Sequence, residues 1–206
     1  MFYLGLDLGQ RRDHTAIAII EKIESRRPWG ESIFLALHLR HAERVPLGTS
    51  YPAIVERIRT IVSVPELRDN VNITVDATGV GAPVVDLLRQ ANLGCHITPV
   101  SITGGDKASL VGNVYNVPKV DLWAGLAIML EREQLVIAKK LPCSAAIARE
   151  LGALSSHTLR AAPGEKDDLA IAIALAVWKA RRSGCGTTTN DRTQDYDAVL
   201  RYHCRL

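Results

Sequence analysis

The sequence predicts an α/β fold built on a mixed sheet, and two features of its 206 residues indicate this. The first forty-odd residues contain three apolar, strand-like runs joined by short connections, which favour antiparallel pairing. Beyond residue 50 the spacing of apolar residues becomes helical, and helical and strand-like segments then alternate. A three-strand meander followed by such alternation is typical of an α/β domain with one core.

Three strands are expected at the start of the chain, at residues 2–9, 14–23 and 32–45. In the first of them, large apolar residues alternate with a tyrosine, a glycine and Asp7, so the strand has two distinct faces. Further strands are expected at residues 71–76, 95–102 and 135–142. Residues 104–118 show little periodicity, and we expect a loop there.

Helices are expected where apolar residues recur every three or four positions. Ile54, Ile58 and Ile61 have this spacing and follow Ser50, which is a suitable N-cap. A second helix should open near Pro83, because proline fits a first helical turn. The remaining helices are expected at residues 119–134, at residues 144–156 and in the later part of 162–182. The last is apolar nearly all round, as is typical of a helix buried against a sheet.

The composition indicates one intracellular domain followed by a tail. After residue 182 the chain becomes polar and unpatterned, so we expect a domain over residues 1–182 and a flexible C-terminal tail over residues 183–206. The four cysteines form no CxxC pair, so neither a disulfide framework nor a zinc site is indicated. Asp7 disrupts any signal peptide, and the longest apolar run has half the roughly 20 residues of a membrane span. We therefore expect a cytoplasmic protein with no membrane partner.

The charge and the glycine-rich stretches limit the class of ligand. A net charge of +3 permits a nucleic-acid partner without requiring one. The stretch TGVGAP lacks the third glycine of the dinucleotide-binding fingerprint, and GGDKAS does not complete a Walker A motif. The sequence therefore contains no ATPase motif of a known kind.

Aspartates stand at three informative places in the sequence. Asp7 and Asp76 each end an apolar strand, on the face opposite its leucine or valine stripe, and each precedes a glycine-containing turn. If the two strands are parallel neighbours, both carboxylates lie at the sheet edge where open α/β sheets bind their ligands. A third acidic pair, Asp167 and Asp168, opens the apolar C-terminal helix.

Carboxylates packed together repel one another and raise each other's pKa, and a divalent cation removes that penalty. Oxygen ligands of this kind suit Mg²⁺ or Mn²⁺. Each acid also has a purely structural interpretation: Asp167 or Asp168 as a helix N-cap, Asp76 as a turn residue, and Asp13 as a solvated turn residue. Asp7 is the hardest to explain in this way, because aspartate is depleted in strands. A metal site is the interpretation that explains all three places together.

Several motifs resemble the RNase H-like nuclease domain of phage terminase large subunits. They are YLGLDLGQRRDHTAIAII, ITVDATGVGAPVVDLL, VPKVDLWAGLAIMLEREQLVIA and GEKDDLAIAIALAVW, which together span about residues 2–179. The resemblance implies a mixed five-stranded sheet flanked by helices. It also implies a site for two divalent ions, Mg²⁺ or Mn²⁺, in which Asp7 bridges, Asp76 and Asp168 (or Asp167) hold one ion each, and Asp13 is a supporting acid. The implied activity is endonucleolytic cutting of concatemeric phage DNA during packaging, by two-metal hydrolysis of phosphodiester bonds.

The sequence departs from this family in two respects. Family members usually carry an ATP-driven motor before the nuclease, whereas here Met1 directly precedes the nuclease strand, as in an excised domain or a free-standing relative. Lys166 stands where the third motif often has histidine. Which of Asp167 and Asp168 points inward stays open, because neighbouring helix positions point about 100° apart.

Double-stranded DNA is the expected partner, bound through its phosphates with little sequence preference. The candidate contacts, each equally well an ordinary surface charge, are Arg11, Arg12, Arg26, Arg27, Lys107 and Lys119. The resemblance adds a separate packaging ATPase, a small terminase or a portal protein as partners, in the cytoplasm of a bacterial host. Three other functions compete: a RuvC-type Holliday-junction resolvase, a non-catalytic DNA-binding module, and an actin-like ATPase, which needs two such domains and a longer chain.

Overall fold

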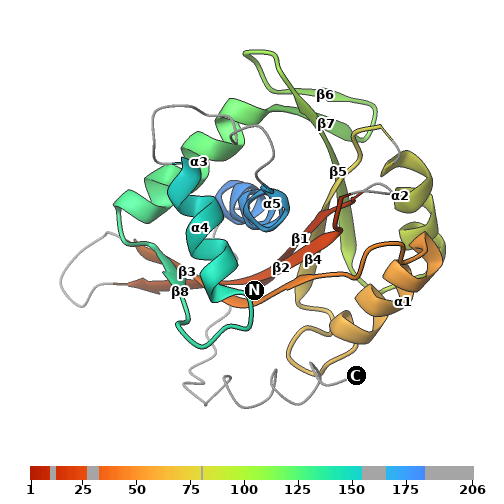
Figure 1. Ribbon diagram of the computed structural model, residues 1–206, viewed down its shortest axis with the longest axis horizontal. Coiled ribbons are helices and arrows are strands. Elements are labelled where there is room, and N and C mark those ends of the chain that lie inside the picture. Colours follow the sequence, from red (N-terminus) through yellow and green to blue (C-terminus); the bar gives the residue numbers. More distant parts are fainter. Residues whose placement is uncertain (10–12, 27–32, 80, 155–165, 184–206) are drawn as a thin grey trace.

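A single mixed sheet runs through the protein, with helices on both of its faces. The computed structural model describes residues 1–9, 13–26, 33–79, 81–154 and 166–183 (Figure 1). Within these ranges the sheet has eight strands in the order β6-β7-β5-β4-β1-β2-β3-β8. They are β1 (Phe2–Asp7), β2 (Ala16–Arg26), β3 (Ile33–Arg44), β4 (Val71–Asp76), β5 (His96–Thr103), β6 (Ser109–Val111), β7 (Val114–Pro118) and β8 (Leu135–Ile137). The helices are α1 (Tyr51–Val62), α2 (Gly81–Gln90), α3 (Lys119–Glu131), α4 (Ser144–Leu154) and α5 (Asp168–Arg182).

The predicted α/β class is confirmed, and so is the antiparallel meander of β1, β2 and β3. The implied number of five strands is wrong, because the short strands β6, β7 and β8 extend the sheet at both edges. Two of them lie in residues 104–118, where a loop was expected. Gly112, with a φ of 61°, makes the tight turn that pairs β6 with β7. All three residues of β6 are exposed, so the strand lacks the alternating pattern that would identify it in the sequence.

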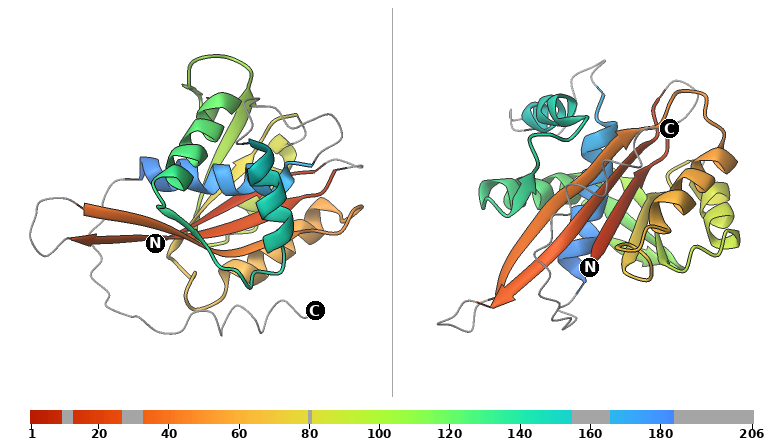
Figure 2. Two further views of the ribbon diagram at one scale, coloured as in Figure 1. Left: turned by 60° about the vertical axis from the view of Figure 1, so that its left-hand side comes forward. Right: turned by 90° about the horizontal axis from the view of Figure 1, so that it is seen from below.

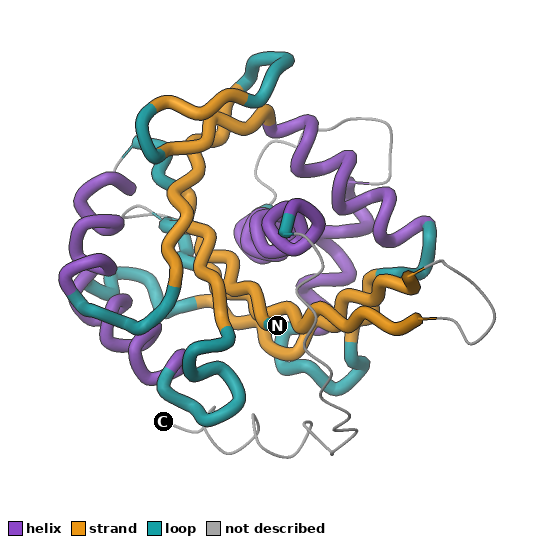
Figure 3. Tube along the Cα trace, turned by 180° about the vertical axis from the view of Figure 1, so that it is seen from behind, coloured by secondary structure: helices purple, strands orange, loops and turns teal. Residues whose placement is uncertain are grey.

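The two faces of the sheet bury two separate cores. Figures 1 and 2 show α3, α4 and α5 on one side of the sheet and α1 and α2 on the other. Phe2, Leu4 and Leu6 of β1 pack toward α1 and α2, whereas Tyr3 faces the helices of the other side. Figure 3 shows the strands as one continuous twisted band, and in Figure 1 that band bends around α5. Strand β1 is therefore buried on both faces, at the centre of the molecule.

Helix α1 forms as its sequence predicts. The Oγ of Ser50 accepts a hydrogen bond from the backbone N–H of Ala53 at 3.4 Å, so the expected N-cap is confirmed. Ile54, Ile58 and Ile61 are all buried. Helix α2 begins at Gly81, two residues before the predicted proline.

Helix α5 crosses β1 at backbone distance, and Gly5 makes this approach possible. A Cβ atom added to Gly5 would lie 1.9 Å from the carbonyl oxygen of Ala172. Only glycine fits at such a contact. Asp168 precedes Ala172 by four residues and so lies on the same face of α5, one turn nearer the helix start. The contact therefore carries the first turn of α5 toward the C-terminal end of β1.

The helices in the described ranges include none that is long and apolar enough to cross a membrane. Residues 184–206 fall outside those ranges, and helix α5 ends at Arg182. The flexible tail over residues 183–206 stays a prediction.

Candidate active site

Two aspartates meet where the parallel strands β1 and β4 end. The register of this pair matches Leu6 with Val75, so the next residues, Asp7 and Asp76, stand side by side. Asp7 is only 9% exposed. One oxygen of Asp76 also serves the following turn, because Oδ1 accepts hydrogen bonds from the backbone N–H of Thr78 (2.8 Å) and from its Oγ1 (2.5 Å). The turn interpretation of Asp76 therefore holds together with its place beside Asp7.

The first turn of α5 brings the other acidic pair, and the two aspartates differ. The side chain of Asp168 is 11% exposed and that of Asp167 is 24% exposed. The Oδ2 of Asp167 accepts a hydrogen bond from Lys119 Nζ at 2.9 Å, so the two residues form an ion pair. The Oδ2 of Asp168 is buried and accepts no hydrogen bond within the described chain, although Arg44 Nε lies 3.4 Å away. Asp168 is thus the inward member of the pair, and Asp167 is neutralised at its flank.

The electrostatics show that all four carboxylates share one neighbourhood. Burial raises the pKa of Asp7 well above its usual range, and repulsion from Asp76, Asp168 and Asp167 raises it further, while Lys119 opposes the shift. Burial likewise raises the pKa of Asp168, against the attraction of Arg44 and of other cationic groups. In the described chain no lysine or arginine lies within ion-pair distance of Asp7. Among the described residues, the ionised form of Asp7 is therefore opposed by burial and by three acids, with only Lys119 acting in its favour.

These acids form no ready-made metal cage. Among the described residues, no three histidine, cysteine, aspartate or glutamate side chains stand in positions that would hold a metal ion together. The donor chemistry nevertheless fits a divalent cation, because the carboxylate oxygens are hard ligands and the buried oxygen of Asp168 lacks a hydrogen-bond donor. Two of the acids also have a cation beside them, with Lys119 Nζ 2.9 Å from Asp167 Oδ2 and Arg44 Nε 3.4 Å from Asp168 Oδ2.

The other predicted site residues lie in different places. Lys119 borders the acids and lies 5.4 Å from the ring centre of Trp123. Asp13 is exposed in the turn between β1 and β2, and Lys107 is exposed in the turn between β5 and β6. The structure shows neither of them in contact with the acids. Arg11, Arg12 and Arg27 lie outside the described residues, as does the side chain of Arg26.

Four residues near the acids were not predicted as site residues: Arg44, Glu150, His14 and the exposed Lys166. Arg44 is the last residue of β3 and Glu150 lies on α4, and they form an ion pair with each other. The Nδ1 of His14 lies 3.1 Å from the carbonyl oxygen of Val45, and the ring is close enough to Asp168 to affect its pKa. One feature of the sequence could have identified Glu150 as a buried acid: it lies three residues after the apolar Ile147, on the same face of the predicted helix. Nothing local marks Arg44.

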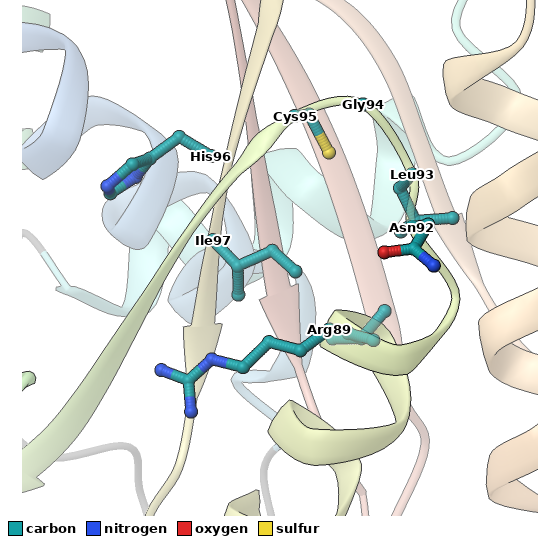
Figure 4. A pocket seen from close by; sticks show the side chains of 8 residues that line it. Arg89, Asn92, Leu93, Gly94, Cys95, His96 and Ile97 are labelled. Atoms are coloured by element: carbon teal, nitrogen blue, oxygen red, sulfur yellow. The ribbon is translucent and has the colours of Figure 1, made fainter.

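A groove lies at the opposite end of the same strands. It encloses about 400 Å³ around the α2–β5 connection, and Figure 4 shows Arg89, Asn92, Cys95 and Ile97 lining it. His96, the first residue of β5, is level with Asn72 near the start of β4, whereas Asp76 ends β4. Burial raises the pKa of Cys95 to about 11, so its thiol stays protonated at neutral pH. The groove is therefore separate from the acids.

Comparison with known proteins identifies the fold. No family model matches the sequence, and no curated protein matches it. Among solved structures, the large terminase nuclease of the thermophilic phage G20c is similar to this protein, with a TM-score of 0.56 and 18% sequence identity. The match covers 87% of this chain and 82% of the phage nuclease chain. The chain has the RNase H-like fold of the terminase nuclease domains.

Two further nuclease domains share this RNase H-like fold. The Mn-soaked human cytomegalovirus terminase nuclease domain matches with a TM-score of 0.54 and 13% identity, over 96% of this chain and 85% of its own. The g2p (large terminase) nuclease domain of bacteriophage SPP1, with bound Mn, matches with a TM-score of 0.52 and 14% identity, over 86% and 85%. The fold is thus shared across most of each chain.

Proposed function

We propose that this protein is a Mg²⁺- or Mn²⁺-dependent DNA endonuclease of the terminase large-subunit type. The observation that carries the proposal is the buried carboxylate of Asp7, which has no basic partner among the described residues and is surrounded by three further acids. Such an arrangement destabilises the folded protein unless a cation joins it. Support also comes from the nuclease domains that share the fold, two of which are described with Mn.

The roles of the residues follow from their positions. Asp7, Asp76 and Asp168 would hold two divalent ions, with Asp7 between the other two and Asp167 at the flank. Ions bound there would lower the pKa of a water molecule and stabilise charge on the departing oxygen. Thr78 fixes Asp76, because its own Oγ1 accepts a hydrogen bond from the backbone N–H of Ile102 at 2.9 Å. The ligand from β4 is thereby tied to β5.

Lys119 is proposed to contact the phosphate next to the scissile bond. Its ammonium group stands between Asp167 and the ring of Trp123, at the margin of the acidic cluster. An approaching phosphate would meet two exposed cations at this margin: Lys119, whose side chain is 38% exposed, and Lys166, which stands next to Asp167 and lowers the pKa of Asp168. Contacts of this kind provide affinity and carry no sequence information.

Supercoiled plasmid tests the activity directly. We expect nicking or linearisation with Mg²⁺ or Mn²⁺ and none with EDTA. ATP should neither be hydrolysed nor change the rate, because no phosphate-binding loop is found in the sequence. Absence of cleavage with either ion at low salt would contradict the proposal. A strong preference for four-way junctions over linear duplex would favour the resolvase, and DNA binding without any cleavage would favour the non-catalytic module.

DNA affinity should depend steeply on salt and little on sequence. Each lysine or arginine that neutralises a phosphate releases counterions, so log affinity falls linearly with log salt. Lys119→Ala is expected to reduce the magnitude of that slope by about 1, equally for unrelated duplexes of the same length. Fluorescence anisotropy in EDTA measures this without cleavage. Arg68→Ala is the control, because it removes an exposed charge just before the start of β4, at the edge away from the acids. If both changes reduce the slope equally, Lys119 does not contact DNA specifically.

A further inference from the structure

Arg44 and Glu150 form a buried connection between three elements beside the acidic cluster. Arg44 ends β3, and its Nη2 donates to Oε1 of Glu150 on α4. Glu150 is 7% exposed, and its other oxygen accepts a hydrogen bond from the backbone N–H of Ala170 at 2.9 Å. Ala170 lies in the first turn of α5, so the carboxylate of one helix caps the start of another. Figures 1 and 2 show α4 on the same side of the sheet as α5.

The same arginine also faces Asp168. Arg44 Nε lies 3.4 Å from Oδ2 of Asp168 without forming a hydrogen bond. The guanidinium therefore attracts this carboxylate, while its hydrogen bond goes to Glu150. Glu150 holds the backbone of the first turn of α5, and Arg44 holds the side chain that this turn presents.

Stability alone does not explain this ion pair, in which Glu150 is buried and Arg44 is half-buried. Taking two charges out of water costs several kcal/mol, and apolar residues of similar size often replace such a pair without loss. Burial raises the pKa of Glu150, the N–H of Ala170 and Arg44 oppose this shift, and the nearby Asp168 and Asp167 add to it. The ionised form of Glu150 therefore depends on the two contacts that tie it to β3 and to the first turn of α5.

We propose that Arg44 and Glu150 are positioning residues that fix the first turn of α5 and orient Asp168 toward a divalent ion. This inference rests on the proposed function. It predicts that the pair sets metal affinity and turnover without contacting DNA. Neither residue needs to touch the reacting atoms, since both act through Asp168.

The test measures Mn²⁺ affinity by calorimetric titration, thermal stability in EDTA, and kcat and KM for plasmid cleavage. Arg44→Gln and Arg44→Lys are both expected to weaken Mn²⁺ binding by about 10- to 100-fold, the usual effect of removing an outer-shell partner, with a matching loss in kcat and little change in KM. The direction in which Arg44→Gln changes Mn²⁺ affinity distinguishes positioning from a simple charge effect. Removing a positive charge would tighten Mn²⁺ if only long-range charge mattered, whereas lost positioning weakens it.

A matched control exists one residue away, on the other face of the sheet. Arg57 of α1 forms a half-buried, two-pronged ion pair with Glu43 of β3, at 2.8 and 2.7 Å, and its exposure is close to that of Arg44. Arg57→Gln should lower thermal stability and leave Mn²⁺ affinity unchanged. If Arg44→Gln does not fold, Glu150→Gln takes its place, because its amide oxygen still accepts from Ala170.

The outcomes are distinct. Mn²⁺ affinity that falls with Arg44→Lys and Arg44→Gln, but not with Arg57→Gln, supports positioning. Loss of thermal stability in both pairs with unchanged Mn²⁺ affinity overturns it, and so does tighter binding by Arg44→Gln. A wild type that neither binds Mn²⁺ nor cleaves DNA would instead refute the proposed function itself.

Discussion

Asp7→Asn is expected to abolish metal-dependent cleavage, by at least about 100-fold, and to leave the metal-free protein as stable as the wild type or more so. The reason lies in the environment of the carboxylate. Asp7 is buried, three other acids repel it, and within the described chain no basic side chain pairs with it. Asparagine has nearly the same shape and no charge, so it relieves the repulsion while removing the central ligand.

The pKa shift fixes the sign of the pH dependence. Because burial and repulsion raise the pKa of Asp7 in the folded state, folding favours its protonated form. In EDTA the wild type should therefore lose stability as pH rises from about 4 through the raised folded-state pKa. In Asp7→Asn this loss should shrink, so the difference between the two proteins should grow toward alkaline pH.

Thermal and urea unfolding, with EDTA and with Mn²⁺, measure both effects. At 100 times its dissociation constant, Mn²⁺ should stabilise the wild type by about 2.7 kcal/mol, because it binds only the folded state. Asp7→Asn should lose most of that gain. Asp121→Asn, at an exposed aspartate in the first turn of α3, is the control and should keep it. A large destabilisation of metal-free Asp7→Asn with an unchanged Mn²⁺ response would identify Asp7 as a structural anion.

Gly5→Ala is expected to destabilise the protein strongly through a single added methyl group. The new Cβ would stand 1.9 Å from the carbonyl oxygen of Ala172, and the next nearest atoms are also backbone of α5. Backbone cannot rotate away as a side chain can, so helix and strand must separate. We expect a loss of about 1–3 kcal/mol in unfolding free energy, the range typical of overpacked cores. The separation would also move Asp168 away from Asp7 and weaken Mn²⁺ binding.

Gly152→Ala is the matched control, because nothing lies within 4 Å of a Cβ added there. Gly152 lies inside α4, where alanine is the better helix former, and a gain of up to about 1 kcal/mol is expected. Urea unfolding of both variants gives the comparison. Equal stabilities would mean that α5 does not pack on β1 at backbone distance.

Much of the fold could be predicted because the relevant patterns are local. Alternation in residues 2–7 identifies a two-faced strand, and the spacing of Ile54, Ile58 and Ile61 identifies the buried side of α1. Ser50 identifies the start of that helix, because its side chain accepts a hydrogen bond from a residue only three positions later. The hairpin of β6 and β7 was missed because its strands are short and one is fully exposed.

The candidate site divides in the same way. The sequence by itself placed Asp7 and Asp76 at strand ends and Asp167 and Asp168 at a helix start, because an acid at the end of an apolar run is visible without any partner. Only the tertiary structure showed that Asp168 lies inward while Asp167 pairs with Lys119. The contact between Arg44 and Glu150 is also visible only in the tertiary structure, because the two residues are 106 positions apart in the chain. Such pairings depend on the crossing of α5 over β1 and on the packing of α4, and contacts between distant segments leave no periodic trace in the sequence.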